Sequence, residues 1–191
     1  MDDTPHATPH RLDAILADAR ALGFAMSCED RTGSLLATLA ASKPAGRILE
    51  LGTGVGAGAA WLLHGMDRAA HLTTIDIDAT VQAVAAKHLG SDPRITIVEH
   101  DADEWLAAYT GRPFDLAYID CRPGKFHRLP NLLDLLRPGA LYVVDDLEPQ
   151  PTWPGDHQPR VDAFLARLPD VHELLSTPIA WASGLVVAAR I

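Results

Sequence analysis

Three glycines, Gly52, Gly54 and Gly56, lie directly after a short apolar run, Arg47–Leu51, and they are the first residues in the chain that suggest chemistry. Glycines in such a turn let the backbone approach a ligand closely and adopt conformations that other residues resist. A strand, a glycine loop and a helix in this order are typical of nucleotide binding. A glycine-rich turn that binds nothing has the same pattern, so the loop is a weak signal by itself.

A carboxylate follows the glycine loop at the distance that nucleotide binding requires. Asp76 stands near the end of the next expected strand, residues 71–77, and lies 24 residues after Gly52, close to the ~20 typical of an acid that binds ribose hydroxyls. The alternative is that Asp76 caps the following helix, a role that Asp78 fits better.

A second acid follows the third expected strand. Asp101 and Ala102 come just after residues 95–99, and the carboxyl end of that strand borders the same crevice. Asp101 is therefore placed to meet an adenine amino group. As a lone acid in a loop, it is equally suited to cap the short helix expected over residues 104–109.

Three further carboxylates follow two neighbouring strands. Asp120 ends the expected strand 114–119, and Asp145 and Asp146 follow the expected strand 141–144. Adjacent parallel strands would bring these groups to one edge of the sheet, where carboxylates repel unless a cation or a proton joins them. Oxygen ligands of this kind suit Mg²⁺, Ca²⁺ or Mn²⁺. The alternative is an acidic loop that binds only water or caps a turn.

The remaining pattern predicts the elements that position these groups. Apolar residues at helical spacing predict helices over residues 10–22 and 31–41, and short apolar strands then alternate with helices across residues 46–146. This alternation predicts an α/β fold, a Rossmann-like doubly wound sheet of seven strands, mostly parallel, with helices on both faces. The last two strands, 172–176 and 185–189, have no helix between them and predict a C-terminal antiparallel hairpin.

We expect one domain over residues 1–191, with N-terminal helices (1–45), a ligand-binding core (46–146) and a C-terminal helix and hairpin (147–191). The helices expected in the core and the tail cover residues 57–64, 80–89, 104–109, 129–136 and 161–168. We expect a proline-rich loop over residues 149–159, a break at residues 137–139, and a tight hairpin connection through Pro178 and Gly184.

Composition restricts the partners and the location. Lys and Arg total 16 against 25 Asp and Glu, a formal charge of −9, which argues against a nucleic-acid footprint and against an anionic membrane surface. No apolar run approaches the ~20 residues that span a bilayer, and no signal peptide is evident. Cys28 and Cys121 form no CxxC motif. We therefore expect a cytoplasmic protein with free thiols, a monomer or a homodimer.

Several of these segments resemble one family. The stretch 49–56 is similar to motif I of the class I S-adenosylmethionine-dependent methyltransferases, and stretches 114–120 and 136–146 are similar to two later motifs of that family. The resemblance implies methyl transfer from S-adenosyl-L-methionine to a small-molecule acceptor, with an oxygen favoured as the acceptor atom. It implies that Glu50 helps to hold the methionine end of the cofactor. The implied cofactor-binding residues are Glu50, Gly52, Thr53, Gly54, Gly56, Asp76, Ile77, Asp101, Ala102 and Asp120.

The chain further resembles the catechol and caffeoyl-CoA O-methyltransferase branch. That branch uses Asp, Asp and Asn, at positions matching Asp120, Asp145 and Asp146, to hold a divalent ion that binds the acceptor oxygens. The resemblance thus implies Mg²⁺ or another divalent cation. This sequence departs from the branch because Asp146 replaces the Asn, and because the lysine expected soon after Asp120 is absent. Lys125 stands five residues after Asp120 instead.

Methyl transfer requires an aligned acceptor and, for many acceptors, a base that removes its proton. The candidate bases are Asp120, Lys125 and His127. Lys125 needs a pKa lowered by burial or by a nearby cation. A histidine titrates near neutral pH without such tuning, although a lone loop histidine is more often solvated. Trp153 and Trp181 are suited to wall an acceptor pocket, or to pack the tail on the sheet.

Two other functions are compatible with parts of the pattern. Gly52, Gly54 and Ala57 also satisfy the glycine motif of nicotinamide-dependent oxidoreductases, but the chain leaves no room for a separate substrate domain. A non-catalytic binding or interaction module with the same fold is the second alternative. Stabilisation by S-adenosylmethionine or by its demethylated product separates a cofactor binder from a module that does not bind it.

Overall fold

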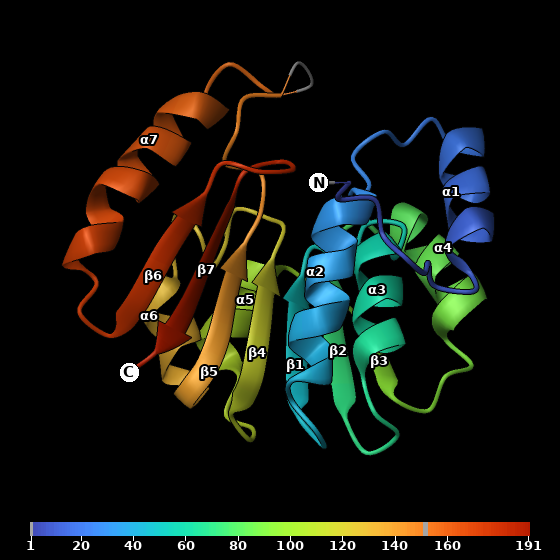
Figure 1. Cartoon of the computed structure of the whole chain (residues 1–191), viewed down its shortest axis with the longest axis horizontal. Coiled ribbons are helices and arrows are strands. Elements are labelled where there is room, and N and C mark those ends of the chain that lie inside the picture. Colours follow the sequence, from blue (N-terminus) through green and yellow to red (C-terminus); the bar gives the residue numbers. More distant parts are fainter. Residues whose placement is uncertain (1, 151–152) are drawn as a thin grey trace.

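The computed structural model describes residues 2–150 and 153–191 and contains one seven-stranded sheet in the order β3-β2-β1-β4-β5-β7-β6 (Figure 1). The strands are β1 (Arg47–Leu51), β2 (His71–Asp76), β3 (Ile95–Glu99), β4 (Phe114–Ile119), β5 (Leu136–Val144), β6 (Leu174–Ile179) and β7 (Leu185–Arg190). The helices are α1 (Leu12–Ala21), α2 (Asp30–Ala41), α3 (Ala57–Gly65), α4 (Ala79–Leu89), α5 (Ala102–Ala108), α6 (Leu129–Asp134) and α7 (His157–Arg167).

The sheet is parallel from β3 to β5, and its last two neighbours confirm the predicted reversal. β7 pairs antiparallel with β5 on one side and with β6 on the other. The predicted class, a mostly parallel α/β sheet with a C-terminal antiparallel hairpin, is therefore confirmed. The strand order changes direction at β1, with β2 on one side and β4 on the other, and ligands of open α/β sheets bind at such a point.

Helices cover both faces of the sheet, because alternate strand residues are apolar on both sides. On one face α1, α2, α3 and α4 pack against residues that include Ile48 and Leu116. On the other face α5, α6 and α7 pack against the intervening residues, which include Leu49 and Leu51. Figure 1 shows these two layers on either side of the strands. The buried strands leave only their ends free to carry polar groups.

Most element boundaries differ from the predictions by one or two residues, and those around β5 and at the start of α7 include larger differences. Helix α6 ends at Asp134, and β5 runs through residues 137–139, where we expected a break; an irregular register between Phe114 and Leu116 accommodates this stretch. Helix α7 begins at His157, within the predicted loop 149–159, of which residues 151–152 lie outside the described residues. Proline is tolerated in the first turn of a helix, so Pro159 does not prevent this start.

The hairpin is longer than predicted. Pro178 lies inside β6 and pairs with Val186, instead of forming the connection between the strands. β6 is at the edge of the sheet, where a proline that lacks the backbone N–H is tolerated. The prediction failed because the sequence alone does not show which strand is at the edge.

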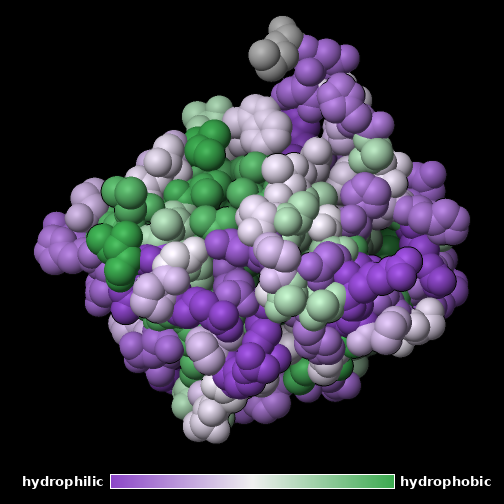
Figure 2. Space-filling model, turned by 60° about the horizontal axis from the view of Figure 1, so that its bottom comes forward, coloured by the Kyte–Doolittle hydropathy of each residue, from purple (hydrophilic) through white to green (hydrophobic). Residues whose placement is uncertain are grey.

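The outer surface is mainly polar. In the view of Figure 2, hydrophilic residues cover most of the visible face, and the apolar ones gather towards one side. Among the described residues, no helix is both long enough and apolar enough to cross a membrane.

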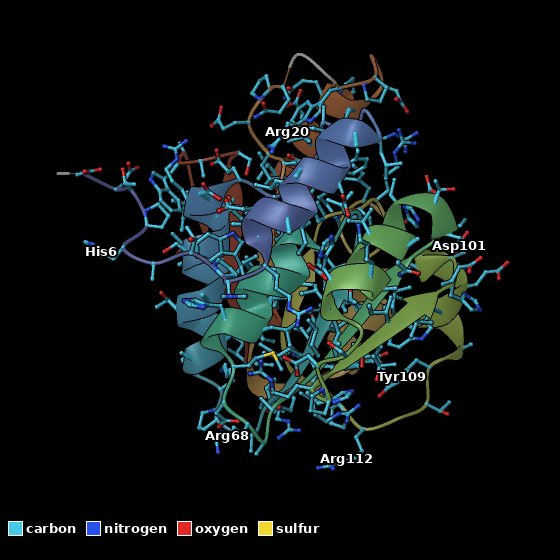
Figure 3. All side chains as sticks on the ribbon, turned by 90° about the vertical axis from the view of Figure 1, so that its right-hand side faces the viewer. His6, Arg20, Arg68, Asp101, Tyr109 and Arg112 are labelled. Carbon is cyan, nitrogen blue, oxygen red and sulfur yellow. The ribbon has the colours of Figure 1, made fainter. Side chains whose placement is uncertain are left out.

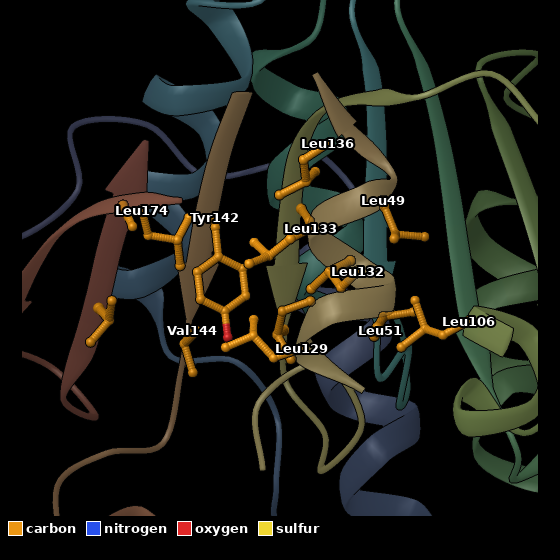
Figure 4. Packing of buried hydrophobic residues seen from close by; sticks show 14 of the residues in the cluster. Leu49, Leu51, Leu106, Leu129, Leu132, Leu133, Leu136, Tyr142, Val144 and Leu174 are labelled. Carbon is orange, nitrogen blue, oxygen red and sulfur yellow. The ribbon is translucent and has the colours of Figure 1, made fainter. Parts of the chain in front are cut away.

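The core between the sheet and helices α5, α6 and α7 contains a buried tyrosine, Tyr142. Tyr142, on β5, is fully buried and lies among the leucines of α6 (Figure 4). Its hydroxyl donates a 2.7 Å hydrogen bond to the carbonyl of Gly124, in the loop after β4. This bond ties that loop to the sheet.

Removal of this hydroxyl should cost stability. Tyr142→Phe should lower the free energy of unfolding by about 1–3 kcal/mol, because the buried carbonyl of Gly124 loses its partner. Urea denaturation measures the change. Tyr109→Phe is the control, since the Tyr109 hydroxyl donates to Arg112 at an exposed position. Equal losses in the two variants would contradict a special role for Tyr142.

Candidate active site

The strand register brings the predicted residues to one edge of the sheet. The last residues of β1, β4 and β5 and the next-to-last residue of β2 pair with one another: Leu51 pairs with Ile75 and Ile119, and Ile119 pairs with Val144. The chain therefore leaves all four strands at the same level. The residues that follow the pairs are Gly52, Asp76, Asp120 and Asp145. Parallel pairing alone is enough to gather carboxylates at this edge.

The glycine loop is fixed to Asp76. The backbone N–H of Gly54 donates to Asp76 Oδ2 at 2.7 Å, and that of Asp78 donates to Oδ1 at 2.9 Å. Gly52 has φ +98°, and a Cβ there would lie 2.7 Å from the carbonyl oxygen of Asp120. Asp78 caps α4 by accepting from Thr80 and Val81. Asp78, and not Asp76, therefore caps the helix that follows β2.

A cavity of about 320 Å³ opens beside this loop, and we call it the glycine-loop cavity. Its lining includes the predicted residues Gly52, Gly54, Asp76, Ile77, Asp101, Ala102 and Asp120. Ile77 presents an exposed apolar surface, with 68% of its area accessible. The cavity therefore combines a flat apolar wall with carboxylates, as a nucleoside requires.

Asp101 caps a helix and also lines the glycine-loop cavity, and its contact with adenine stays a prediction. Its carboxylate accepts from the backbone N–H of Asp103 at 2.7 Å and so caps α5. It also lines the glycine-loop cavity. Figure 3 shows Asp101 at the right-hand edge of the molecule, above Tyr109 and Arg112, which follow the other end of α5.

Glu50 is buried beneath the glycine loop and does not line the glycine-loop cavity. Only 1% of it is exposed, and its Oε2 accepts a 2.5 Å hydrogen bond from the hydroxyl of Thr74 on the neighbouring strand. Burial raises the pKa of Glu50 to about 8, against the lowering effect of the Thr74 hydroxyl. Gly58 of α3 leaves the space that Glu50 Oε1 occupies, since a Cβ there would clash with it.

A chain of hydrogen bonds leads to this carboxylate. The amide of Gln82 donates to the hydroxyl of Thr53 at 3.1 Å and to the carbonyl of Val98 at 3.0 Å. The hydroxyls of Thr53 and Thr74 are 2.7 Å apart. Because the Thr74 proton goes to Glu50, Thr53 donates to Thr74, so every hydroxyl in the chain has one donor and one acceptor role.

Thr53 and Gly56 belong to the glycine loop but do not line the glycine-loop cavity. Thr53 is buried in the chain described above, with 3% exposed. Gly56 does not line the glycine-loop cavity; it has φ +92°, and a Cβ there would lie 2.7 Å from that of Ala85 on α4. Its lack of a side chain serves helix packing, the role of the third glycine in nucleotide-binding turns.

A second cavity, of about 160 Å³, lies next to the first, and we call it the acidic cavity. Its walls include Met26, Cys28, Glu29, Asp120, Asp145, Asp146, Trp153 and Ser183. Asp120 and Asp146 line both cavities, and so does Met26, in the segment between α1 and α2. The two cavities therefore meet at the ends of β4 and β5.

The shared carboxylates hold their protons more tightly than usual. Burial raises the pKa of Asp120 well above its ordinary value, helped by the charges of Asp145 and Asp146 and opposed by Lys125. Burial and the charge of Asp145 raise the pKa of Asp146 to about 6. Among the described residues, no hydrogen bond or ion pair reaches the carboxylate of Asp120, which leaves it free to accept one from a ligand.

The predicted three-carboxylate metal site is not formed. Asp145 Oδ2 accepts a 2.6 Å hydrogen bond from the hydroxyl of Tyr118, and Oδ1 accepts from the hydroxyl of Ser183 and from the N–H of Asp146 at 2.7 Å. Within residues 2–150 and 153–191, no group of three His, Cys, Asp or Glu side chains is arranged to hold an ion. The three carboxylates do not form a ready-made ion site in the described residues, because hydroxyls distant in sequence occupy oxygens of Asp145, and the binding of a divalent cation stays a prediction.

The other two candidate bases are also placed differently from the prediction. Lys125 is buried, and its Nζ donates to the carbonyl of Asp145 at 2.8 Å, without lining either cavity. His127 lies on the surface, 3.2 Å from Asp103. Of the two tryptophans, Trp153 lines the acidic cavity, whereas Trp181 donates to Asp3. Asp120 is the one candidate base that reaches both cavities.

Sequence reasoning missed the residues that hold the carboxylates. They are Thr74, Gln82, Tyr118 and Ser183. A polar residue inside an apolar strand or helix was the available signal for Thr74 and Gln82, and Tyr118 stands two positions before Asp120. Ser183 carries no such signal, because only the folded hairpin brings it to Asp145.

A third cavity, of about 340 Å³, lies away from this edge. Its walls come from residues near the N-terminus, from α3 and from residues 88–94, and they include His10, His64 and His88. None of the predicted site residues lines it. Size alone therefore does not identify the functional site, and the strand-end carboxylates do.

Residues 49–147 match the model of a family described as a methyltransferase domain, and this match covers just over half of the chain. The chain belongs to this methyltransferase family. The matched segment begins in β1 and ends just after Asp146, so it contains the glycine loop and all the strand-end carboxylates. The family resemblance seen in the sequence is confirmed.

Relatives of this methyltransferase support the same assignment. A Mycolicibacterium vanbaalenii protein named "Putative O-methyltransferase" is 35% identical over 140 residues, which cover 69% of this chain and 62% of that protein. The chain thus spans less than two thirds of that relative. A catechol O-methyltransferase of Mycobacterium tuberculosis is 29% identical over 167 residues, covering 77% of this chain and 75% of that protein.

A solved structure is similar to this chain over nearly all of its residues. The O-methyltransferase TomG of Streptomyces achromogenes, solved in complex with S-adenosylmethionine, is 25% identical and has a TM-score of 0.83. The alignment covers 96% of this chain and 91% of that one. The N-terminal helices and the C-terminal hairpin therefore belong to the shared fold.

The buried Glu50 should make stability depend on pH. Its pKa is about 8 in the folded protein against 4.5 as a free group, so its contribution is complete below pH 4.5 and is lost as the pH rises towards 8. Relative to Glu50→Gln, the wild type should lose up to about 1.4 kcal/mol per pH unit across this window. Denaturation at several pH values measures this difference.

Glu99→Gln is the matched control, because Glu99 is exposed at the end of β3. It should follow the wild type at every pH. Parallel stability curves for the wild type and Glu50→Gln would contradict a protonated, buried Glu50.

Proposed function

We propose that the protein transfers a methyl group from S-adenosylmethionine to an oxygen atom of a small-molecule acceptor. The observation that carries the proposal is the position of Asp120, on the wall that the two cavities share. One cavity suits the cofactor and the other suits the acceptor, so their junction is where a methyl group would pass. Family membership and the O-methyltransferase relatives support the same reaction.

The cofactor end of the proposal rests on the glycine-loop cavity. The N–H groups of Gly54 and Asp78 orient the carboxylate of Asp76, which keeps further lone pairs for two ribose hydroxyls. Ile77 offers an apolar face for adenine, with Asp101 and Ala102 beside it. Glu50 lies beneath the loop with a pKa of about 8, and a cationic methionine end bound nearby would favour its ionised form and be attracted by it.

The acceptor end rests on the acidic cavity. Trp153 supplies a flat apolar wall, and Met26 supplies a flexible one. The carboxylates of Asp120, Asp146 and Glu29 supply acceptors for hydrogen bonds. A volume of about 160 Å³ limits the enclosed part of the acceptor to a small ring or a chain of similar size. Small hydroxylated molecules fit these features better than macromolecules do.

The reaction requires alignment and removal of a proton. S-adenosylmethionine supplies a methyl group on a sulfonium, which is already a good leaving group. Asp120 accepts the proton of the acceptor hydroxyl, and its raised pKa makes it a stronger base than an ordinary aspartate. In the segment between α1 and α2, Phe24 lines the glycine-loop cavity and Met26 lines both cavities, so this segment is placed to exclude water once the ligands are bound.

The two alternatives from the sequence are separable. The family match covers the glycine loop that suggested a nicotinamide-dependent oxidoreductase, and it favours the methyl donor. A non-catalytic module with this fold predicts cofactor binding without turnover, so detection of a methylated product decides against it.

Loss of the ribose acceptor should weaken cofactor binding. Asp76→Ala should reduce the affinity for S-adenosylhomocysteine by about 10–150-fold, the effect of about 1.5–3 kcal/mol for hydrogen bonds to a charged group. Calorimetry measures the affinity. Asp103→Ala is the control, since Asp103 pairs with Arg128 near the same edge. Unchanged affinity in Asp76→Ala would remove Asp76 from the cofactor site.

Loss of the base should slow methyl transfer without loss of the cofactor. With a panel of small phenols and hydroxy acids, Asp120→Asn should lower kcat by about 10²–10⁴-fold and leave the affinity for S-adenosylhomocysteine within a few-fold. The wild-type rate should fall as the pH drops through the raised pKa of Asp120, because the protonated form accepts no proton. An unchanged rate in Asp120→Asn would contradict this role.

A further inference from the structure

The carboxylates at the cavity junction are neutralised by groups of the protein itself. Where carboxylates converge, their repulsion must be offset by a cation, a proton or hydrogen-bond donors. In the metal-dependent branch that the sequence resembles, the offset is a divalent ion. Here the donors come from four different segments of the chain, and three hydrogen bonds occupy most of the lone pairs of Asp145.

Asp145 is the clearest case. It is 3% exposed, and both carboxylate oxygens accept hydrogen bonds from the protein. The donors are the hydroxyls of Tyr118 and Ser183 and the backbone N–H of Asp146. A metal ion bound by both oxygens of Asp145 would have to displace at least one of these donors and leave it without its partner, which costs free energy; only the second lone pair of Oδ2 is open to an ion.

Lys125 supplies the positive charge. It is 1% exposed, and its ammonium group donates to the carbonyl of Asp145 at 2.8 Å and lies 5.1 Å from the centre of the Phe126 ring. Its charge opposes the rise of the pKa of both Asp120 and Asp146. A buried ammonium close to these carboxylates disfavours a divalent cation at the same place by charge repulsion.

We propose that Lys125, with the hydroxyls of Tyr118 and Ser183, takes the place of a divalent cation, so that the acceptor is bound without a metal. This inference rests on the proposed function. It bears on the substrate class, because an acceptor that is not bound to a metal needs no pair of adjacent oxygens. One hydroxyl within reach of Asp120 is sufficient. Catechols are then one group of acceptors among many hydroxylated molecules.

Titration with Mn²⁺ tests this replacement. The full-length wild type, saturated with S-adenosylhomocysteine, should leave the electron paramagnetic resonance signal of free Mn²⁺ unchanged at millimolar concentrations. Lys125→Met removes the ammonium at similar volume and should raise the Mn²⁺ affinity by at least about tenfold, which corresponds to about 1.4 kcal/mol. Tyr118→Phe frees one oxygen of Asp145 and should also raise it, in case Lys125→Met does not fold.

Arg122→Met is the matched control. It removes a positive charge from the same loop, but Arg122 is half-exposed and pairs with Asp156, so Mn²⁺ affinity should stay at the wild-type level. Saturable Mn²⁺ binding by the wild type that is lost in Asp145→Asn would overturn the proposal. Equal Mn²⁺ affinities in Lys125→Met, Tyr118→Phe and Arg122→Met would overturn it too. Failure of the wild type to bind S-adenosylhomocysteine would instead contradict the proposed function.

Discussion

The parallel register of β1, β2, β4 and β5 determines most of what this protein can do. It ends four buried strands at one level and so forces Asp76, Asp120 and Asp145 into a small region of low dielectric. Carboxylate charges placed together in this way cost free energy unless hydrogen bonds, protons or cations offset them. The surrounding residues are best understood as the groups that satisfy them.

Three of the four carboxylates at this edge have hydrogen-bond partners of different kinds, and the fourth, Asp120, differs from them. Asp76 receives backbone N–H groups from the glycine loop and α4, and Asp145 receives side-chain hydroxyls. Glu50 is held by one threonine hydroxyl and keeps a high pKa. Asp120 has no such partner among the described residues. The group that the protein leaves unsatisfied is the one at the junction of the two cavities.

The sequence was sufficient for the fold and for bringing Gly52, Gly54, Asp76 and Asp101 to one cavity, because both depend on local patterns. Apolar strands alternating with helices predicted the sheet, and an acid after β2 predicted Asp76. The acceptor half depends on contacts distant in sequence, such as Ser183 with Asp145 across 38 positions. The burial of Lys125 and the surface position of His127 also follow from packing, which spacing within a loop does not reveal.

A crystal structure with S-adenosylhomocysteine tests the account most directly, because it shows at once which cavity binds the cofactor and where the sulfur atom points. The account predicts adenosine in the glycine-loop cavity, with both ribose hydroxyls on Asp76 and the sulfur facing Asp120. Binding in the cavity lined by His10, His64 and His88, or a sulfur atom that faces away from Asp120, would contradict it.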